Sequence, residues 1–212
     1  MSTYATALAL ILTLEGGCVD NPADPGGATC YGITQGVYNE YLRQAGRRSR
    51  PVTNITRDEV EAIYRERYWA PSGAADWDEH GHPGIALYVF DTAVNHGLRG
   101  ADSIITDSIH RTLNNHPLLG LALLHTARME YYANLPHWDT FGRGWTRRIA
   151  RVYREAMQLE HPDGLLRVNS LDLNGVEWDV GIARIVRERI WARGERVAPP
   201  CSWWQRLIGG CK

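Results

Sequence analysis

The chain has 212 residues, of which 44% are hydrophobic and 22% charged, so it is long and apolar enough for one globular domain, or for a principal domain with a smaller C-terminal lobe. Lys and Arg total 23 against 24 Asp and Glu, and this balance argues against a nucleic-acid-binding protein that relies on a strong basic field. Eight Trp and ten Tyr against two Phe form an unusual aromatic set, which suits carbohydrate contacts or interfaces as well as a core.

The opening segment MSTYATALALILTL has the apolar character of a signal peptide. However, no Lys or Arg precedes the apolar run and no small-residue cleavage site follows it. The run is also shorter than the roughly 20 residues that span a bilayer. We therefore expect a buried first helix, no stable membrane insertion, and synthesis in the cytoplasm without a signal peptide.

Helix signals dominate the rest of the chain and alternating strand-like runs are almost absent, so we expect a mainly α-helical fold. Thr56 and Glu59 form a capping-box pattern, and Pro83 suits the first turn of a helix. The segment 117–134 is apolar nearly all round, which predicts a central buried helix. Other helices are predicted at 34–45, 56–71, 83–97, 101–113, 145–159 and 178–193, with a turn-rich break at 136–145.

Glu15 directly follows the first apolar run, and two glycines come after it. A carboxyl group partly shielded at the end of an apolar helix is expected to have a raised pKa, which a general acid at neutral pH requires. Asp24 and Thr29 follow in a tight loop that is able to face Glu15. Two carboxyl groups flanking a scissile bond are the requirement for hydrolysing a glycoside. The alternative is a helix C-terminus capped by glycine, followed by an ordinary turn.

Four cysteines, at positions 18, 30, 201 and 211, allow three pairings if all are oxidised. Short loops favour Cys18 with Cys30 and Cys201 with Cys211, but the pairing is not deducible from spacing. In a reducing compartment all four stay thiols.

Three other sets of polar or aromatic residues are candidates for binding roles. Asp91 and Asn95 are four apart on a largely apolar helix, so they either cap internal backbone groups or line a cleft. The acidic and histidine-rich run at 75–82 is a solvated turn rather than a metal site, because it lacks the HExxH spacing. Tyr31 is the best aromatic candidate for a sugar contact.

Arginines gather at 47–50 and again at 143–154. Each group is either a solvated surface or a site for an anionic polymer.

The motifs EGG at 15–17, DPGGAT at 24–29 and YGIT at 31–34 together resemble the N-terminal signature of the glycoside hydrolase 108 family of bacterial and phage N-acetylmuramidases. The segments YRERYW (64–69), DTAVNHG (91–97) and FGRGWTRRI (141–149) resemble the same family, so the similarity covers roughly residues 4–160. The order Glu15, Asp24, Thr29 is also similar to the catalytic triad of phage T4-type lysozymes, although Thr29 follows Asp24 one residue sooner here. Cys18 stands where the family usually has Tyr.

The resemblance implies a lysozyme-like helical domain with a small β-hairpin or loop region near the catalytic Glu15 and a C-terminal helical extension. It implies a catalytic region at 1–100, a helical and predicted peptidoglycan-binding region at 101–160, and a helix and irregular tail at 161–212. Glu15 would be the acid, with Asp24 and Thr29 positioning water and Tyr31, Asp91 and Asn95 binding substrate.

We therefore predict an N-acetylmuramidase that cleaves the β-1,4 bond between N-acetylmuramic acid and N-acetylglucosamine, without metal or other cofactor. The expected protein is a monomeric phage endolysin that a holin releases to peptidoglycan in the periplasm. The alternatives are a bacterial muramidase that assists protein secretion, and a cell-wall binding module without catalysis. A Cys18–Cys30 disulfide would preorganise the site after export.

Overall fold

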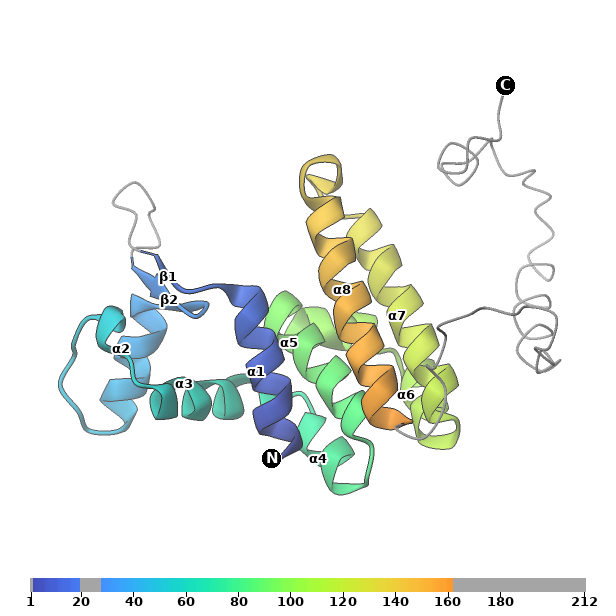
Figure 1. The fold of residues 1–212 in the computed structure, drawn as a ribbon, viewed down its shortest axis with the longest axis horizontal. Helices are drawn as coiled ribbons and strands as arrows, with labels where there is room; N and C mark the ends of the chain where they lie inside the picture. Colours follow the sequence, from blue (N-terminus) through green and yellow to red (C-terminus); the bar gives the residue numbers. More distant parts are fainter. Residues whose placement is uncertain (1, 20–27, 162–212) are drawn as a thin grey trace, which may run out of the picture. The chain divides into compact units, whose positions relative to one another are not determined.

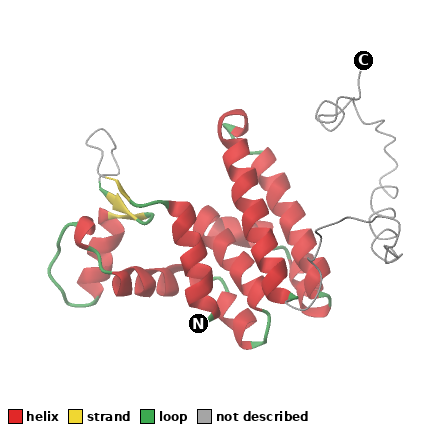
Figure 2. Ribbon diagram, viewed as in Figure 1, coloured by secondary structure: helices red, strands yellow, loops and turns green. Residues whose placement is uncertain are grey.

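The structure is a computed structural model that describes residues 2–19 and 28–161. These residues belong to the first of the two units into which the chain divides, Met1–Arg167. They form helices joined by short loops, with one small sheet near the N-terminus (Figure 2). The expected mainly α-helical fold with a small β region beside Glu15 is confirmed. The helix predicted at 178–193 lies outside the described residues.

The elements follow one another in the order drawn in Figure 1. They are α1 (Thr3–Glu15), β1 (Cys18–Val19), β2 (Thr29–Cys30), β3 (Ile33–Thr34), α2 (Gln35–Gln44), a 3-10 turn (Val52–Asn54), α3 (Arg57–Tyr64), a π-helical turn (Arg65–Trp69), α4 (Ala74–Glu79), α5 (Pro83–Ile104), α6 (Asp107–Asn115), α7 (Pro117–Ala133) and α8 (Trp138–Glu160).

The first helix, α1, is buried along one face, as its apolar run predicts. Ser2 caps it by accepting a hydrogen bond from the backbone N–H of Ala5 at 3.2 Å. Its buried residues are Tyr4, Ala7, Leu8, Ile11 and Leu12, at the spacing of a single helical stripe. This stripe packs against α5. Among the described residues, no helix is long and apolar enough to cross a membrane.

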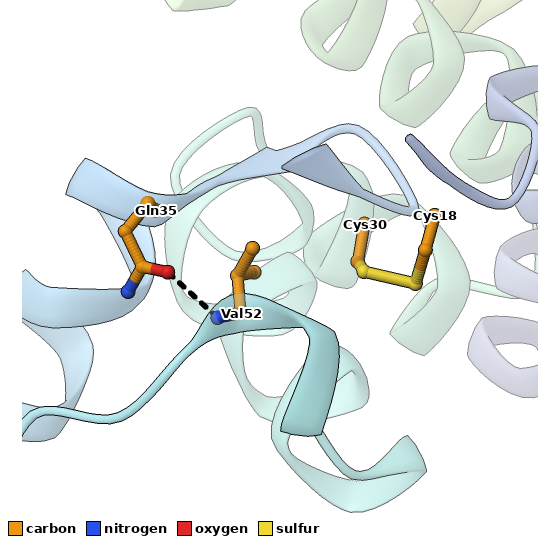
Figure 3. The surroundings of a disulfide bond; sticks show 4 residues. All are labelled: Cys18, Cys30, Gln35 and Val52. Atoms are coloured by element: carbon orange, nitrogen blue, oxygen red, sulfur yellow. Dashed lines mark hydrogen bonds between the residues drawn. A yellow bond between two sulfur atoms is a disulfide. The ribbon is translucent and has the colours of Figure 1, made fainter. Parts of the chain in front are cut away.

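The sheet has three short antiparallel strands in the order β1-β2-β3. Cys18 lies opposite Cys30 in the register, and a disulfide joins them (Figure 3). Just after β3, the Gln35 side-chain oxygen accepts a hydrogen bond from the backbone N–H of Val52 at 2.7 Å, which ties the start of α2 to the segment that leads into α3. The sheet and these two helices therefore hold the segment that follows Glu15.

Glu59 fastens α2 to α3. Its side chain is only 5% exposed and accepts hydrogen bonds from the Tyr38 hydroxyl at 2.8 Å, from Arg50 and from the Thr56 backbone N–H at 2.9 Å. Burial alone would raise the pKa of Glu59, but these donors outweigh burial and lower it to about 2. The contact with Thr56 is half of the predicted capping box, whose two hydrogen bonds are both present.

The central helix, α5, does not end at Gly97 as predicted. Gly97 adopts a φ of 70°, so the chain bends there and continues as a helix to Ile104. Glycine reaches this conformation at little cost, which turns an expected stop into a kink. The helix predicted at 101–113 is therefore wrong in its bounds, because α6 begins only at Asp107.

Helix α7 was expected to be buried all round, and this is wrong. Leu118, Leu119 and Leu123 are only partly buried. The buried face consists of Gly120, Leu121, Leu124, Arg128 and Tyr132. The helix therefore delivers a charged side chain to the interior.

Two predicted turns are helical. Helix α8 begins at Trp138, inside the expected break at 136–145, because Gly142 packs under the Trp138 ring: a Cβ on Gly142 would lie 2.8 Å from that ring. The run at 75–82 was expected to be a turn, yet its first residues form α4 as far as Glu79. Both segments are therefore helical although their residues favour turns.

Candidate active site

Glu15 is the last residue of α1, and Gly16 ends the helix with a φ of 84°. The Glu15 side chain is 21% exposed, so it reaches solvent from a largely packed position. A Cβ on Gly16 or on Gly17 would have no described atom within 4 Å apart from its chain neighbours. The two glycines therefore leave open space next to the carboxylate.

Gly32 closes the other side of Glu15. It has a φ of 73°, and a Cβ there would lie 3.1 Å from Glu15 Oε2 and 3.0 Å from the Tyr64 hydroxyl. Tyr64 is buried and donates a hydrogen bond to the backbone carbonyl of Tyr31 at 2.7 Å. Only glycine fits this turn, both for its conformation and for the close approach. The Tyr31 ring is 37% exposed, so its predicted contact with a sugar stays a prediction.

Arg148, from the middle of α8, joins two carboxylates. Its Nη1 donates to Glu15 Oε1 at 2.7 Å, and its Nη2 and Nε donate to Asp91 Oδ1 at 2.9 and 3.2 Å. Because the arginine fork is planar and rigid, fixing one side of it on Asp91 fixes the direction of the other. Glu15 is therefore held through one oxygen, Oε1, while Oε2 lies against Gly32.

Asp91, on α5, is 0% exposed and forms a second ion pair with Arg128 Nη2 at 2.7 Å. The geometry of this second contact is that of an ion pair rather than a hydrogen bond. Burial alone would raise the pKa of Asp91, but the charges of Arg128 and Arg148 outweigh burial and hold it below its ordinary value. Asp91 was predicted to bind substrate or to cap backbone groups; it is fully buried and paired with two arginines, and its contact with substrate stays a prediction.

The far side of Arg128 is closed by neutral groups. Its Nε donates to His96 Nε2 at 3.3 Å, and its guanidinium lies over the ring of Tyr132, 5.8 Å from the centroid. Burial, with the nearby charge of Arg128, lowers the pKa of His96 to about 4, so the imidazole stays neutral and accepts. Asn95 accepts a hydrogen bond from the Tyr132 hydroxyl. Its predicted contact with substrate stays a prediction.

Of the two other predicted catalytic residues, the structure describes Thr29. Thr29 is in β2, paired across the register with Val19 of β1. Asp24 lies outside the described residues, as do Cys201 and Cys211. Because Val19 and Thr29 are cross-strand partners, the segment that carries Asp24 leaves and rejoins the sheet at neighbouring points, closed by the Cys18–Cys30 disulfide.

The sequence did not single out the arginine that holds Glu15. Arg148 is one of the arginines at 143–154, which the sequence marks only as a solvated surface or a site for an anionic polymer, and no sequence pattern points to Arg128. The only available signals were an arginine inside a leucine-rich segment and the three-residue offset of Arg148 from Trp145, which places them on the same face of α8. Neither signal names Glu15 or Asp91 as the partner.

A cavity of about 450 Å³ lies elsewhere, between α4, α5 and α6. Its lining includes Trp77, His80, His82 and His110. Within residues 2–19 and 28–161, no group of three or more His, Cys, Asp or Glu side chains is arranged to hold a metal ion.

Comparison with known proteins finds a matching family and a similar solved structure. Residues 8–97 match the model of the family described as glycosyl hydrolase 108. The structure of SagA from Brucella abortus is similar, with 28% sequence identity and a TM-score of 0.60 over 77% of this chain and 98% of that one. No curated protein is a significant match.

Proposed function

Because residues 8–97 match the glycosyl hydrolase 108 family, we propose that this chain, a glycoside hydrolase that acts on peptidoglycan, is an N-acetylmuramidase with Glu15 as its general acid. The bond cleaved is the β-1,4 linkage between N-acetylmuramic acid and N-acetylglucosamine. The observation that carries this proposal is the carboxylate of Glu15, held through one oxygen by Arg148 and flanked by two glycines with open space beside them.

We infer different roles for the two oxygens of Glu15 from their contacts. Oε1 accepts from Arg148 at 2.7 Å and serves as the anchor. Oε2, which lies against Gly32, is then the oxygen that carries the proton and delivers it to the leaving oxygen of the glycoside. An anchored acid loses little orientational freedom when substrate binds.

We assign the second carboxylate to Asp24, with Thr29 helping to position water. The segment between Val19 and Thr29 begins and ends beside the strand that follows Glu15, and the disulfide closes it. A separation of about 6.5–9.5 Å between the two carboxyl groups would admit a water molecule and invert the anomeric centre.

Aromatic side chains near Arg148 support binding of a glycan. Phe141, Trp145 and Arg148 are spaced four and three residues apart, so they share one face of α8. Phe141 is 54% exposed, and Trp145 is partly buried, stacked on Tyr132 with ring centroids 5.2 Å apart. Flat aromatic faces pack against sugar rings, so this face, together with Tyr31, is the proposed sugar-binding surface.

The test is release of reducing saccharide ends from purified peptidoglycan by the wild type and by Glu15→Gln. Loss of a general acid is expected to lower the rate by about 10²–10⁴-fold. The matched control is Glu66→Gln, which makes the same change at an exposed glutamate. Equal rates for wild type and Glu15→Gln would remove Glu15 from catalysis, and no release by the wild type would favour a binding module instead.

We further propose that the enzyme is a phage endolysin that reaches the periplasm through a holin. A disulfide beside the site fits a protein that works in an oxidising compartment. Expression in a Gram-negative host is then expected to cause lysis only when a holin is co-expressed. Lysis without a holin would contradict this route.

A further inference from the structure

Helix α8 carries a row of arginines on its outer face. Arg143, Arg147 and Arg151 follow one another at intervals of four residues, and all three are exposed. The buried residues of α8 are Gly142, Ile149, Val152 and Ala156, on the side that packs against α5 and α7. The row is about 12 Å long, given the rise of 1.5 Å per helical residue.

The side chains of these three arginines make no ion pair or hydrogen bond with any described residue. Other exposed arginines do have partners: Arg43 pairs with Glu40 at 2.7 Å and Arg57 with Glu61 at 3.0 Å, each within its own helix. Like charges four residues apart repel each other and destabilise a helix. Within the described part of the chain, the row is therefore a set of unpaired cations that an external anion would stabilise.

We propose that this row, Arg143, Arg147 and Arg151, binds the carboxylates of the peptide chains of peptidoglycan while the glycan lies at Glu15. The proposal rests on the proposed function, because it concerns the same substrate. Arg147 and Arg151 lie one and three residues from Arg148, whose side chain contacts Glu15. Peptide chains attached to a glycan in the site therefore fall within reach of the row.

Carboxylates fit this surface better than the other anions of a cell. Arginine presents a planar fork that matches a carboxylate in a two-point contact. A helix that lies in a membrane surface must offer its apolar face to lipid, but the apolar face of α8 is buried against α5 and α7. Nucleic acid needs a wider basic field than a chain with a formal net charge of −1 provides.

The experiment measures binding of the full chain to purified sacculi by co-sedimentation, in a Glu15→Gln background so that the wall stays intact. The row variant combines Arg143→Gln, Arg147→Gln and Arg151→Gln. Exposed ion pairs contribute little singly, so the apparent Kd for native sacculi is expected to rise about tenfold for the three together. Unchanged binding would overturn the proposal.

A matched control removes the same charge elsewhere, by Arg48→Gln, Arg99→Gln and Arg111→Gln. These arginines are also exposed and have no ion pair with a described residue. The control variant is expected to bind native sacculi as tightly as the parent. A tenfold loss in the control as well would show a nonspecific effect of net charge and reject the row.

Two further probes identify the anion. Sacculi whose carboxylates have been converted to neutral amides are expected to bind parent and row variant equally weakly. If the row variant still loses tenfold on amidated sacculi, carboxylates are not the ligand. The second probe is binding to vesicles of anionic phospholipid. If the row variant loses binding only to these vesicles and keeps binding to native sacculi, the row binds a lipid surface and the proposal fails.

Cleavage is measured separately, with Glu15 restored, on a short soluble glycan fragment without peptides. The row variant is expected to cleave this fragment at the wild-type rate. A wild type that cleaves nothing would refute the proposed function, whereas an equal rate with unchanged binding to sacculi would refute only the role of the row.

Discussion

Asp91→Asn is the most informative single substitution in the interior. It keeps the size of the side chain but removes the charge that Arg128 and Arg148 share. Arg128 is 0% exposed and would be left as an uncompensated buried cation. Breaking a buried pair in this way costs about 3–5 kcal/mol. For a domain of this size that corresponds to a fall of roughly 6–20 °C in Tm.

The same substitution is expected to slow catalysis without touching the substrate. Asp91 fixes one side of the Arg148 fork, and the other side fixes Glu15. Loosening the fork misplaces the general acid, so kcat is expected to fall by at least tenfold while KM changes little. Asp91 is a positioning residue in this account.

The assay is thermal unfolding by circular dichroism together with release of reducing ends well below Tm. The control is Glu160→Gln, which alters another buried carboxylate between α5 and α8. Glu160 accepts from His82 at 2.6 Å and from the Gly84 backbone N–H at 3.1 Å, and none of its hydrogen bonds involves Arg148. The control is expected to lose stability but keep kcat. If Asp91→Asn keeps kcat as well, the connection from Asp91 to Glu15 is wrong.

The pH dependence of stability provides a second test of the Asp91 ion pairs. Its pKa in the folded state is lowered, so its contribution to stability is fully present above about pH 4, near its ordinary value, and is lost as the pH falls through the folded-state pKa. The stability difference between wild type and Asp91→Asn is therefore expected to shrink in acid. A difference that grows below pH 4 would contradict the ion-pair assignment.

Three other predictions concern residues that support the segment around Glu15. Replacing Cys18 and Cys30 by Ala opens a loop with a sequence separation of 12, so the free energy of unfolding is expected to fall by about 3 kcal/mol. Activity is expected to fall to the same extent as in the reduced wild type. An unchanged rate in the double variant would show that the disulfide does not preorganise the site. Gly32→Ala places a methyl group 3.1 Å from Glu15 Oε2 at a residue in a left-handed conformation. The free energy of unfolding is expected to fall by roughly 1–2 kcal/mol, and kcat is expected to fall as well. Gly17→Ala, in open space, is expected to change neither. Equal effects of the two glycine substitutions would refute the close approach. Because the pKa of Glu59 is lowered to about 2, the free energy of unfolding is expected to fall by about 3 kcal/mol as the pH drops from about 4.5 to 2. In urea unfolding, Glu59→Gln is expected to lack this fall. The same decrease in the variant would show that other carboxylates cause it.

Local chemistry sufficed for the parts of the fold that depend on neighbouring residues. The Thr56 and Glu59 capping box formed as predicted, because both hydrogen bonds lie within one helical turn. Thr34 caps α2 by accepting from the Val37 backbone N–H at 3.3 Å, for the same reason. The predicted turn at 136–145 is wrong from Trp138 onward, where α8 begins and Gly142 lies close to the Trp138 ring one turn earlier.

The sequence by itself determined the helical class, the buried first helix and the position of Glu15 at its end, followed by glycines, because these follow from periodicity and from adjacent residues. It did not determine which charges meet. Arg148 lies 133 residues from Glu15 and 57 from Asp91, and no local pattern encodes a contact across such separations. Only the packing of α1, α5, α7 and α8 brings these groups together, because a buried carboxylate must find cations wherever the fold places them.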